Sequence, residues 1–129
     1  MPSMFEADAS LDKLAATAIT RTKELMKESD RLRDRRTIAS DDLWLSGAYH
    51  RDSLAIHFTW KKDLAIYPLI EKVEAALRPF NYRPHWGKVF TADGKYLSSV
   101  YPKISEFKAL VEALDPTLKF ENLFTRKFI

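Results

Sequence analysis

The sequence predicts an α+β fold, in which helices pack on one face of a small, mainly antiparallel sheet. Two patterns support this class. Residues 53–61 alternate between apolar and polar side chains, as a strand does, whereas residues 11–33 and 63–77 place apolar side chains at helical spacing. The chain has 129 residues, 46% of them hydrophobic, and no cysteine, so it can bury one core without disulfide bonds.

The first predicted element is a long amphipathic helix from Leu11 to about Arg33, with Ser10 as its N-cap. Its apolar stripe consists of Leu14, Ala15, Ala18, Ile19, Leu25 and Met26. After this helix, residues 37–45 are expected to be extended or irregular and to end in a turn at residues 46–47.

The alternating segment 53–61 predicts a strand with two chemically different faces. Leu54, Ile56, Phe58 and Trp60 form an apolar face that enters the core. His57 and Thr59 then point outward together. An ordinary strand with a hydrated outer face is one interpretation. The other is a ligand-facing surface, which the Ala, His and Thr composition weakly favours.

A second helix is expected after Asp63, with Pro68 tolerated in its first turn and Pro79 forcing its end. Its apolar stripe is formed by Ile66, Ile70, Val73 and Leu77. Farther along the chain, residues 93–94 (Asp-Gly) have the composition of a turn.

A third, shorter helix is predicted between Ser105, as its N-cap, and the Asp-Pro pair at residues 115–116. Its apolar stripe consists of Phe107, Leu110, Val111 and Leu114. The remaining segments are expected to be connections, and the sequence has no internal repeat.

The charge pattern argues against nucleic-acid binding. The net charge is +3, from 21 basic and 18 acidic residues. The densest basic stretch, residues 31–36, is interleaved with Asp34, which is typical of a hydrated or ion-paired helix end. There is no signal-like N-terminus and no apolar run long enough to cross a bilayer. We therefore expect an intracellular, cytoplasmic protein that does not bind nucleic acid.

Residues 83–88 (Arg-Pro-His-Trp-Gly-Lys) are the most informative stretch of the sequence. They combine a titratable ring, a large aromatic side chain, one of only three glycines and a lysine. This mixture would be costly if its only task were to fill a core. The segment therefore predicts a functional site.

Three segments carry a resemblance to a known family: residues 36–46, residues 51–60 and the block at 83–88. Together they resemble the C-terminal substrate domain of the D-arabinono-1,4-lactone oxidase family, whose members are FAD-dependent oxidases related to vanillyl-alcohol oxidase. Within that family the sequence is most similar to the alditol (xylitol) oxidases. The similarity continues through Tyr101-Pro102, Phe107, Asp115-Pro116 and residues 120–122. It implies a substrate domain at residues 36–129, preceded by a poorly matched helix at residues 1–35.

The resemblance also implies roles for individual residues. Lys88, His57 and Arg36 match catalytic positions. Substrate binding falls on Arg36, His57, Thr59, Lys88 and Asp34. Contacts with the flavin fall on His85, Gly87 and Lys88. Asp34 stands where the family usually has glutamate, so its carboxylate lies about one methylene farther from a ligand. No two of the three histidines have the spacing of metal ligands, and we predict no metal site.

The implied cofactor is FAD, and the implied reaction is the oxidation of an alditol or a sugar-1,4-lactone with oxygen as acceptor. The three glycines are too scattered for a phosphate-binding turn, so we expect the main FAD-binding domain to be missing from this chain. The alternative is a non-catalytic remnant, or a polyol-binding module that needs a separate flavin domain. An uncovered apolar face would promote self-association. Membrane association would follow only from the family.

Overall fold

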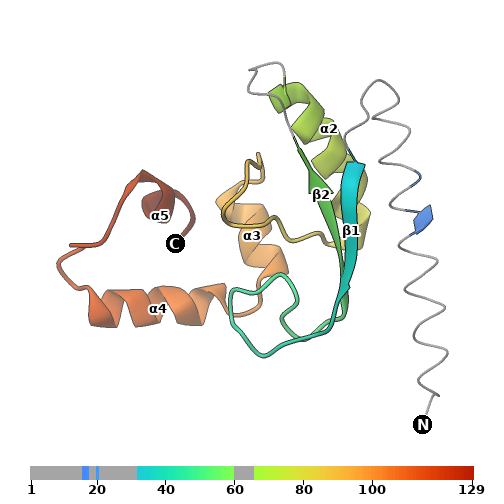
Figure 1. Ribbon diagram of the computed structural model, residues 1–129. Coiled ribbons are helices and arrows are strands. Elements are labelled where there is room, and N and C mark those ends of the chain that lie inside the picture. The colour runs from blue at the N-terminus through green and yellow to red at the C-terminus, as the bar shows by residue number, and fades with distance from the viewer. Residues whose placement is uncertain (1–15, 18–19, 21–31, 60–65) are drawn as a thin grey trace, which may run out of the picture. The chain divides into compact units, whose positions relative to one another are not determined.

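The computed structural model describes residues 16–17, 20, 32–59 and 66–129 (Figure 1). The elements follow in the order β1 (Leu32–Ile38), β2 (Ser53–Phe58), α2 (Ile66–Leu77), the 3-10 helix η1 (Arg78–Phe80), α3 (Gly94–Val100), α4 (Ile104–Leu114) and α5 (Leu123–Phe128). The strands β1 and β2 form a two-stranded antiparallel sheet, so the predicted α+β class is confirmed.

Backbone contacts divide the chain into two compact units. Unit 1 comprises residues 1–37 and 54–82, and unit 2 comprises residues 38–53 and 83–129. Unit 1 therefore contains most of the sheet together with α2, whereas unit 2 contains the loop after β1 and the three C-terminal helices.

Strand β1 corrects the sequence prediction at the end of the first helix. Leu32 and Arg33 were expected to be helical, but both belong to the strand. Residues 32–36 have no apolar stripe for a helix to bury, and the β-branched pair Thr37 and Ile38 favours a strand that can pair with β2. Residues 16, 17 and 20 are helical as predicted, and the rest of the predicted helix up to residue 31 lies outside the described residues.

Strand β2 shows the predicted alternation at its C-terminal end, whereas Ser53 and Ala55 are half-buried like Leu54. Leu54, Ile56 and Phe58 are half-buried, whereas His57 and Thr59 are exposed. The strand ends at Phe58, before the predicted end at residue 61. Residues 60–61 lie outside the described part of the chain.

Helix α2 follows the predicted apolar stripe. Ile70 and Val73 are buried, and Glu74 is buried beside them. The helix ends at Leu77, because Pro79 lacks the N–H that another α-helical turn would need, and the chain continues as η1. The predicted start at residue 63 lies outside the described residues.

Unit 2 contains a helix that the sequence analysis missed. Residues 93–94 were interpreted as a turn, but the Asp93 side chain accepts a hydrogen bond from the Tyr96 amide at 2.8 Å and caps α3. Aspartate favours both turns and N-caps, so the residue type does not distinguish them. Helix α3 supplies much of the core of this unit, since Leu97 has 0% and Val100 6% exposure.

The C-terminal helices also differ from the predictions. Helix α4 begins at Ile104, so Ser105 lies inside the helix and does not cap it. Helix α5 was not predicted. It begins with a capping box in which the Asn122 side chain accepts from the Thr125 amide at 3.0 Å and the Thr125 hydroxyl accepts from the Asn122 amide at 2.8 Å. None of the helices in the described part of the chain is both long and apolar enough to span a bilayer.

Candidate functional site

The sheet of unit 1 carries the first set of predicted site residues. Asp34 and Arg36 lie in β1, two positions apart. Arg36 is exposed. His57 in β2 and Thr59 just after it are exposed as well. The sheet and the residue after it thus carry a guanidinium, an imidazole and a hydroxyl group, which are groups that can hydrogen-bond with a hydroxyl-rich ligand.

A tight turn in unit 2 carries the second set. The Lys88 amide donates to the His85 carbonyl at 3.0 Å, and the Gly87 amide donates to His85 Nδ1 at 3.0 Å. A Cβ atom on Gly87 would lie only 3.3 Å from His85 Cε1, so glycine allows the imidazole to fold back over the turn. His85, Gly87 and Lys88 are exposed. Among the described residues, the Lys88 ammonium group has no hydrogen-bond or ion-pair partner.

Arg83, at the start of the same block, is a structural residue of unit 2. Its Nε donates to the Val100 carbonyl at 2.6 Å. Its Nη1 donates to the Tyr49 carbonyl at 2.9 Å and to the Gly47 carbonyl at 3.3 Å. One side chain therefore ties the loop after β1 to the C-terminal end of α3.

Trp86 and Tyr101 support the turn through hydrogen bonds with backbone carbonyls. Trp86 Nε1 donates to the Leu45 carbonyl at 2.9 Å, and the Tyr101 hydroxyl donates to the Pro84 carbonyl at 2.9 Å. The Trp86 and Tyr101 rings lie 4.9 Å apart between centroids. Phe90 and Phe124 contact Trp86 edge to face. The turn thus rests on a cluster of aromatic side chains in which Tyr101 is buried and Trp86 and Phe90 are half-buried.

The loop held by Arg83 has its own hydrogen-bond network. Asp41 accepts from the Ser46 hydroxyl at 2.5 Å and from the Leu43 amide at 3.0 Å. The Asp41 amide donates to the Ala48 carbonyl at 3.1 Å, and the His50 amide donates back to the Asp41 carbonyl at 2.9 Å. These bonds order a segment for which the sequence predicted no regular structure.

Burial shifts the pKa values of two side chains that support the turn, Tyr101 and Arg83. Desolvation raises the pKa of Tyr101 to about 12, so its hydroxyl keeps the proton that it donates to Pro84. Desolvation, together with the neighbouring Arg51, lowers the pKa of Arg83 from its ordinary value. An arginine still remains charged at neutral pH. The Arg83 guanidinium therefore remains positively charged beside the carbonyl oxygens to which it donates.

The structure groups the predicted site residues in two places. Asp34, Arg36 and His57 belong to the sheet of unit 1 and Thr59 follows it directly, whereas His85, Gly87 and Lys88 belong to one turn of unit 2. Sequence reasoning missed Arg83 and Tyr101 as supports of the turn. Their partners are backbone carbonyls 17 to 36 positions away, and no local pattern reports such contacts.

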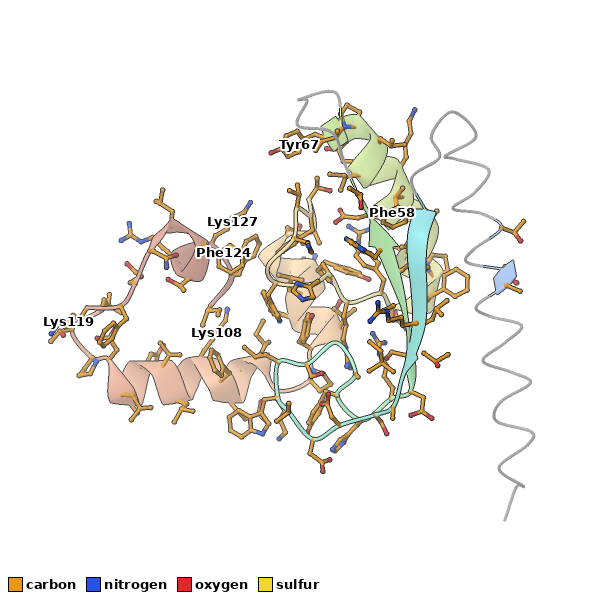
Figure 2. The ribbon with its side chains drawn as sticks, in the orientation of Figure 1. Phe58, Tyr67, Lys108, Lys119, Phe124 and Lys127 are labelled. Atoms are coloured by element: carbon orange, nitrogen blue, oxygen red, sulfur yellow. The ribbon has the colours of Figure 1, made fainter. Side chains whose placement is uncertain are left out.

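Apolar side chains are exposed on the C-terminal half of unit 2. Figure 2 shows Lys108 on α4, and Phe124 and Lys127 on α5. The exposed fractions of the apolar side chains are Leu110 44%, Leu114 75%, Leu118 54%, Phe120 78%, Leu123 84% and Phe124 39%. Such exposure is typical of a surface that meets another protein. In the described ranges, no three histidine, aspartate or glutamate side chains form a metal-binding group.

Comparison with known proteins shows that the chain is related to oxidoreductases of hydroxyl-rich compounds. The sequence model of the family described as D-arabinono-1,4-lactone oxidase matches residues 33–128, and the chain belongs to this family. It is a family of FAD-linked oxidases and dehydrogenases of alditols and sugar lactones. The match includes every predicted site residue.

The names of individual relatives agree with the description of this family. The chain is 46% identical over 95 residues to an alditol oxidase of Streptomyces sp. (strain IKD472 / FERM P-14339), covering 73% of this chain and 23% of that protein. It is 33% identical over 91 residues to an L-gulono-1,4-lactone dehydrogenase of Mycobacterium tuberculosis, covering 70% and 21%. An L-gulonolactone oxidase of Mus musculus is 31% identical over 91 residues, covering 67% and 21%. The chain thus spans less than a quarter of the length of these relatives.

Proposed function

We propose that this chain supplies the substrate-binding and flavin-capping part of an FAD-dependent oxidoreductase that oxidises an alditol or a sugar-1,4-lactone, with oxygen as acceptor. The observation that carries the proposal is the exposed Lys88 on a turn that Arg83, Trp86 and Tyr101 support through hydrogen bonds, at the position where the resemblance implies the family lysine.

The side chains of the sheet suit an oxygen-rich substrate. Arg36 presents a planar fork of donors that would hold substrate oxygens in a fixed orientation. The Thr59 hydroxyl can donate to or accept from a sugar hydroxyl. His57 is placed to take the proton of the hydroxyl group on the carbon that is oxidised, because imidazole is the usual proton acceptor near neutral pH.

The turn suits the reactive edge of a flavin. When bound, the flavin accepts a hydride from the substrate carbon and gains negative charge at its N1/C2-oxygen edge. Lys88 would stabilise that charge, and the absence of a side chain on Gly87 would let the ring approach the backbone. His85 would contact the same ring. The residues that the structure describes fit this edge, whereas the three separated glycines do not fit the cofactor's phosphates.

A chimera tests the proposal. The matching segment of the Streptomyces alditol oxidase is replaced by residues 33–128, and the purified protein is assayed for flavin absorbance and for hydrogen peroxide with xylitol and with a sugar-1,4-lactone. We expect bound flavin and peroxide with at least one substrate. A flavin-loaded chimera that binds xylitol without oxidising it would instead support a polyol-binding module. If the chimera oxidises a substrate with an artificial electron acceptor but forms no peroxide, only the proposal that oxygen is the acceptor would be wrong.

We also propose that the isolated chain self-associates through the exposed apolar side chains of α4 and α5. Sedimentation velocity at increasing protein concentration should show a rising mean sedimentation coefficient. Changing Leu114 and Leu123 to lysine should weaken this association, because the substitutions place charge on the two highly exposed leucines. The matched control changes the exposed Val89, outside these helices, to lysine. Association that survives the double substitution, or monomers at all concentrations, would contradict this prediction.

A further inference from the structure

Arg83 occupies an unusual environment for a cation. Its guanidinium donates to the carbonyl oxygens of Val100, Gly47 and Tyr49 and forms no ion pair with a carboxylate of the described residues. Two of these three residues are buried, since Tyr49 has 7% and Val100 6% exposure. Arginine is suited to this task because its donors are held in a rigid plane and can reach several acceptors at once.

The contacts of Arg83 join three segments that lie far apart in the sequence. The residue begins the block that ends at Lys88, and it binds both the loop after β1 and the end of α3. Trp86, three residues later, grips the same loop through the Leu45 carbonyl. Tyr101, directly after Val100, holds Pro84 and lies with its ring 5.5 Å from the Arg83 guanidinium carbon. Hydrogen bonds of Arg83, Trp86 and Tyr101 therefore hold the backbone of the segment that leads to Lys88.

We propose that Arg83 is a positioning residue, which sets the place of Lys88 by clamping the turn at residues 85–88 to the loop at residues 45–49 and to the C-terminal end of α3. This inference rests on the proposed function for its catalytic consequence, but the clamp itself is a property of unit 2. Its removal should displace the turn without unfolding the unit, because the aromatic contacts of Trp86 remain.

The test uses Arg83→Lys, which keeps the positive charge but replaces the planar fork by a single ammonium group. Arg51→Lys is the matched control. Arg51 is a half-buried arginine of the same unit whose pKa is also lowered by burial, and its side chain forms no hydrogen bond or ion pair with the described residues. A general effect of burying lysine in place of arginine would appear in both variants.

The three glycines allow a measurement on the full chain that does not depend on activity. In an amide proton–nitrogen NMR spectrum, Arg83→Lys should shift the signals of Gly47, whose carbonyl it binds, and Gly87, in the turn. The signal of Gly94, at the start of α3, should stay in place. Arg51→Lys should leave Gly87 unshifted. An unshifted Gly87 in Arg83→Lys, with the chain folded, would overturn the clamp.

Kinetics of the flavin-loaded chimera test the link to Lys88. Arg83→Lys should lower kcat/KM by about tenfold to a hundredfold, as misplacement of a catalytic group does. Added to Lys88→Met, it should cause no further loss, because a residue that acts through Lys88 has nothing left to position. A loss that multiplies in the double variant, or equals that of Arg51→Lys, would overturn the positioning role. If the unsubstituted chimera is inactive, the proposed function fails, and the Gly87 signal alone decides the clamp.

Discussion

The two regions that carry the candidate site hold their functional side chains by different means. In unit 1, His57 lies in a strand and Thr59 follows it directly, and the alternation of that strand turns both side chains outward. In unit 2, Lys88 lies on an irregular turn whose place depends on side chains that bind distant carbonyls, above all Arg83 and Tyr101. Main-chain periodicity therefore positions the candidate side chains of unit 1, and long-range side-chain contacts position those of unit 2.

The two regions therefore differ in their sensitivity to substitutions. A single side-chain change next to His57 leaves the strand hydrogen bonds in place, because those bonds belong to the backbone. A single change at Arg83 or Tyr101 removes a support of the turn and leaves buried carbonyl groups without a donor. We therefore expect remote substitutions to affect Lys88 more than His57.

The largest expected effect comes from removing the cation of the turn. Lys88→Met in the flavin-loaded chimera should lower kcat by about 100- to 1,000-fold, the cost of losing one group that stabilises developing charge. Its thermal midpoint should stay close to that of the parent, because Lys88 is exposed. The control is Lys95→Met, at another exposed lysine of unit 2. Full turnover in Lys88→Met would remove this residue from the site.

Removing the proton acceptor of the sheet should have the next largest effect. His57→Asn should lower kcat by about 100-fold, the usual contribution of a general base. The matched substitution is His50→Asn, at an exposed histidine that contacts Asp42 at 3.0 Å and has a φ of 51°, which asparagine tolerates. Steady-state assays of both variants should separate the histidines, and equal activity in both would assign no catalytic role to His57.

Tyr101→Phe tests the support of the turn through stability. The substitution leaves the Pro84 carbonyl without its donor and should lower the free energy of unfolding by about 1–3 kcal/mol in urea titrations. The pH dependence adds a second readout. Because the pKa of Tyr101 rises from 10.0 to about 12 in the folded chain, its contribution to stability is complete below pH 10 and is lost as the pH rises toward 12. The decline in the free energy of unfolding above pH 10 should be smaller in Tyr101→Phe, and an identical decline would contradict this assignment.

The smallest effect is expected at Asp34, where the family usually has glutamate. Asp34→Glu should raise kcat/KM of the chimera by about threefold to tenfold, because the longer side chain brings the carboxylate closer to the substrate. Asp52→Glu, at an exposed aspartate of unit 2, is the control. If Asp34→Glu lowers activity, the pocket of this chain has adapted to the shorter acid.

The sequence predicted the structural features that depend on periodicity. The alternation in β2 placed His57 and Thr59 outward, and the apolar stripe of α2 predicted buried Ile70 and Val73. It failed where one residue type serves two structures. The Asp-Gly pair at residues 93–94 has the composition of a turn, but Asp93 caps α3. The end of the first predicted helix is a strand, because residues 32–36 have no apolar stripe and Thr37 and Ile38 favour pairing with β2.

The supports of the turn could not be predicted from any local pattern. The block at residues 83–88 was predicted to be a site, and His85, Gly87 and Lys88 are its exposed members. Arg83 and Trp86 belong to the same block but serve the structure, because their donors reach carbonyls 34 and 41 positions earlier. Only the tertiary fold separates the members that support the turn from the members that a ligand can reach.

The most direct test of the central claim is reduction of the flavin in the chimera under anaerobic conditions. The chimera is mixed with xylitol or with a sugar-1,4-lactone, and the loss of flavin absorbance measures the reduction. The measurement does not depend on which acceptor reoxidises the flavin. We predict rapid bleaching by at least one of these substrates and slower bleaching in the Lys88→Met and His57→Asn variants. A chimera that holds flavin but is not reduced by any alditol or lactone would contradict the proposal that these residues form an oxidising site.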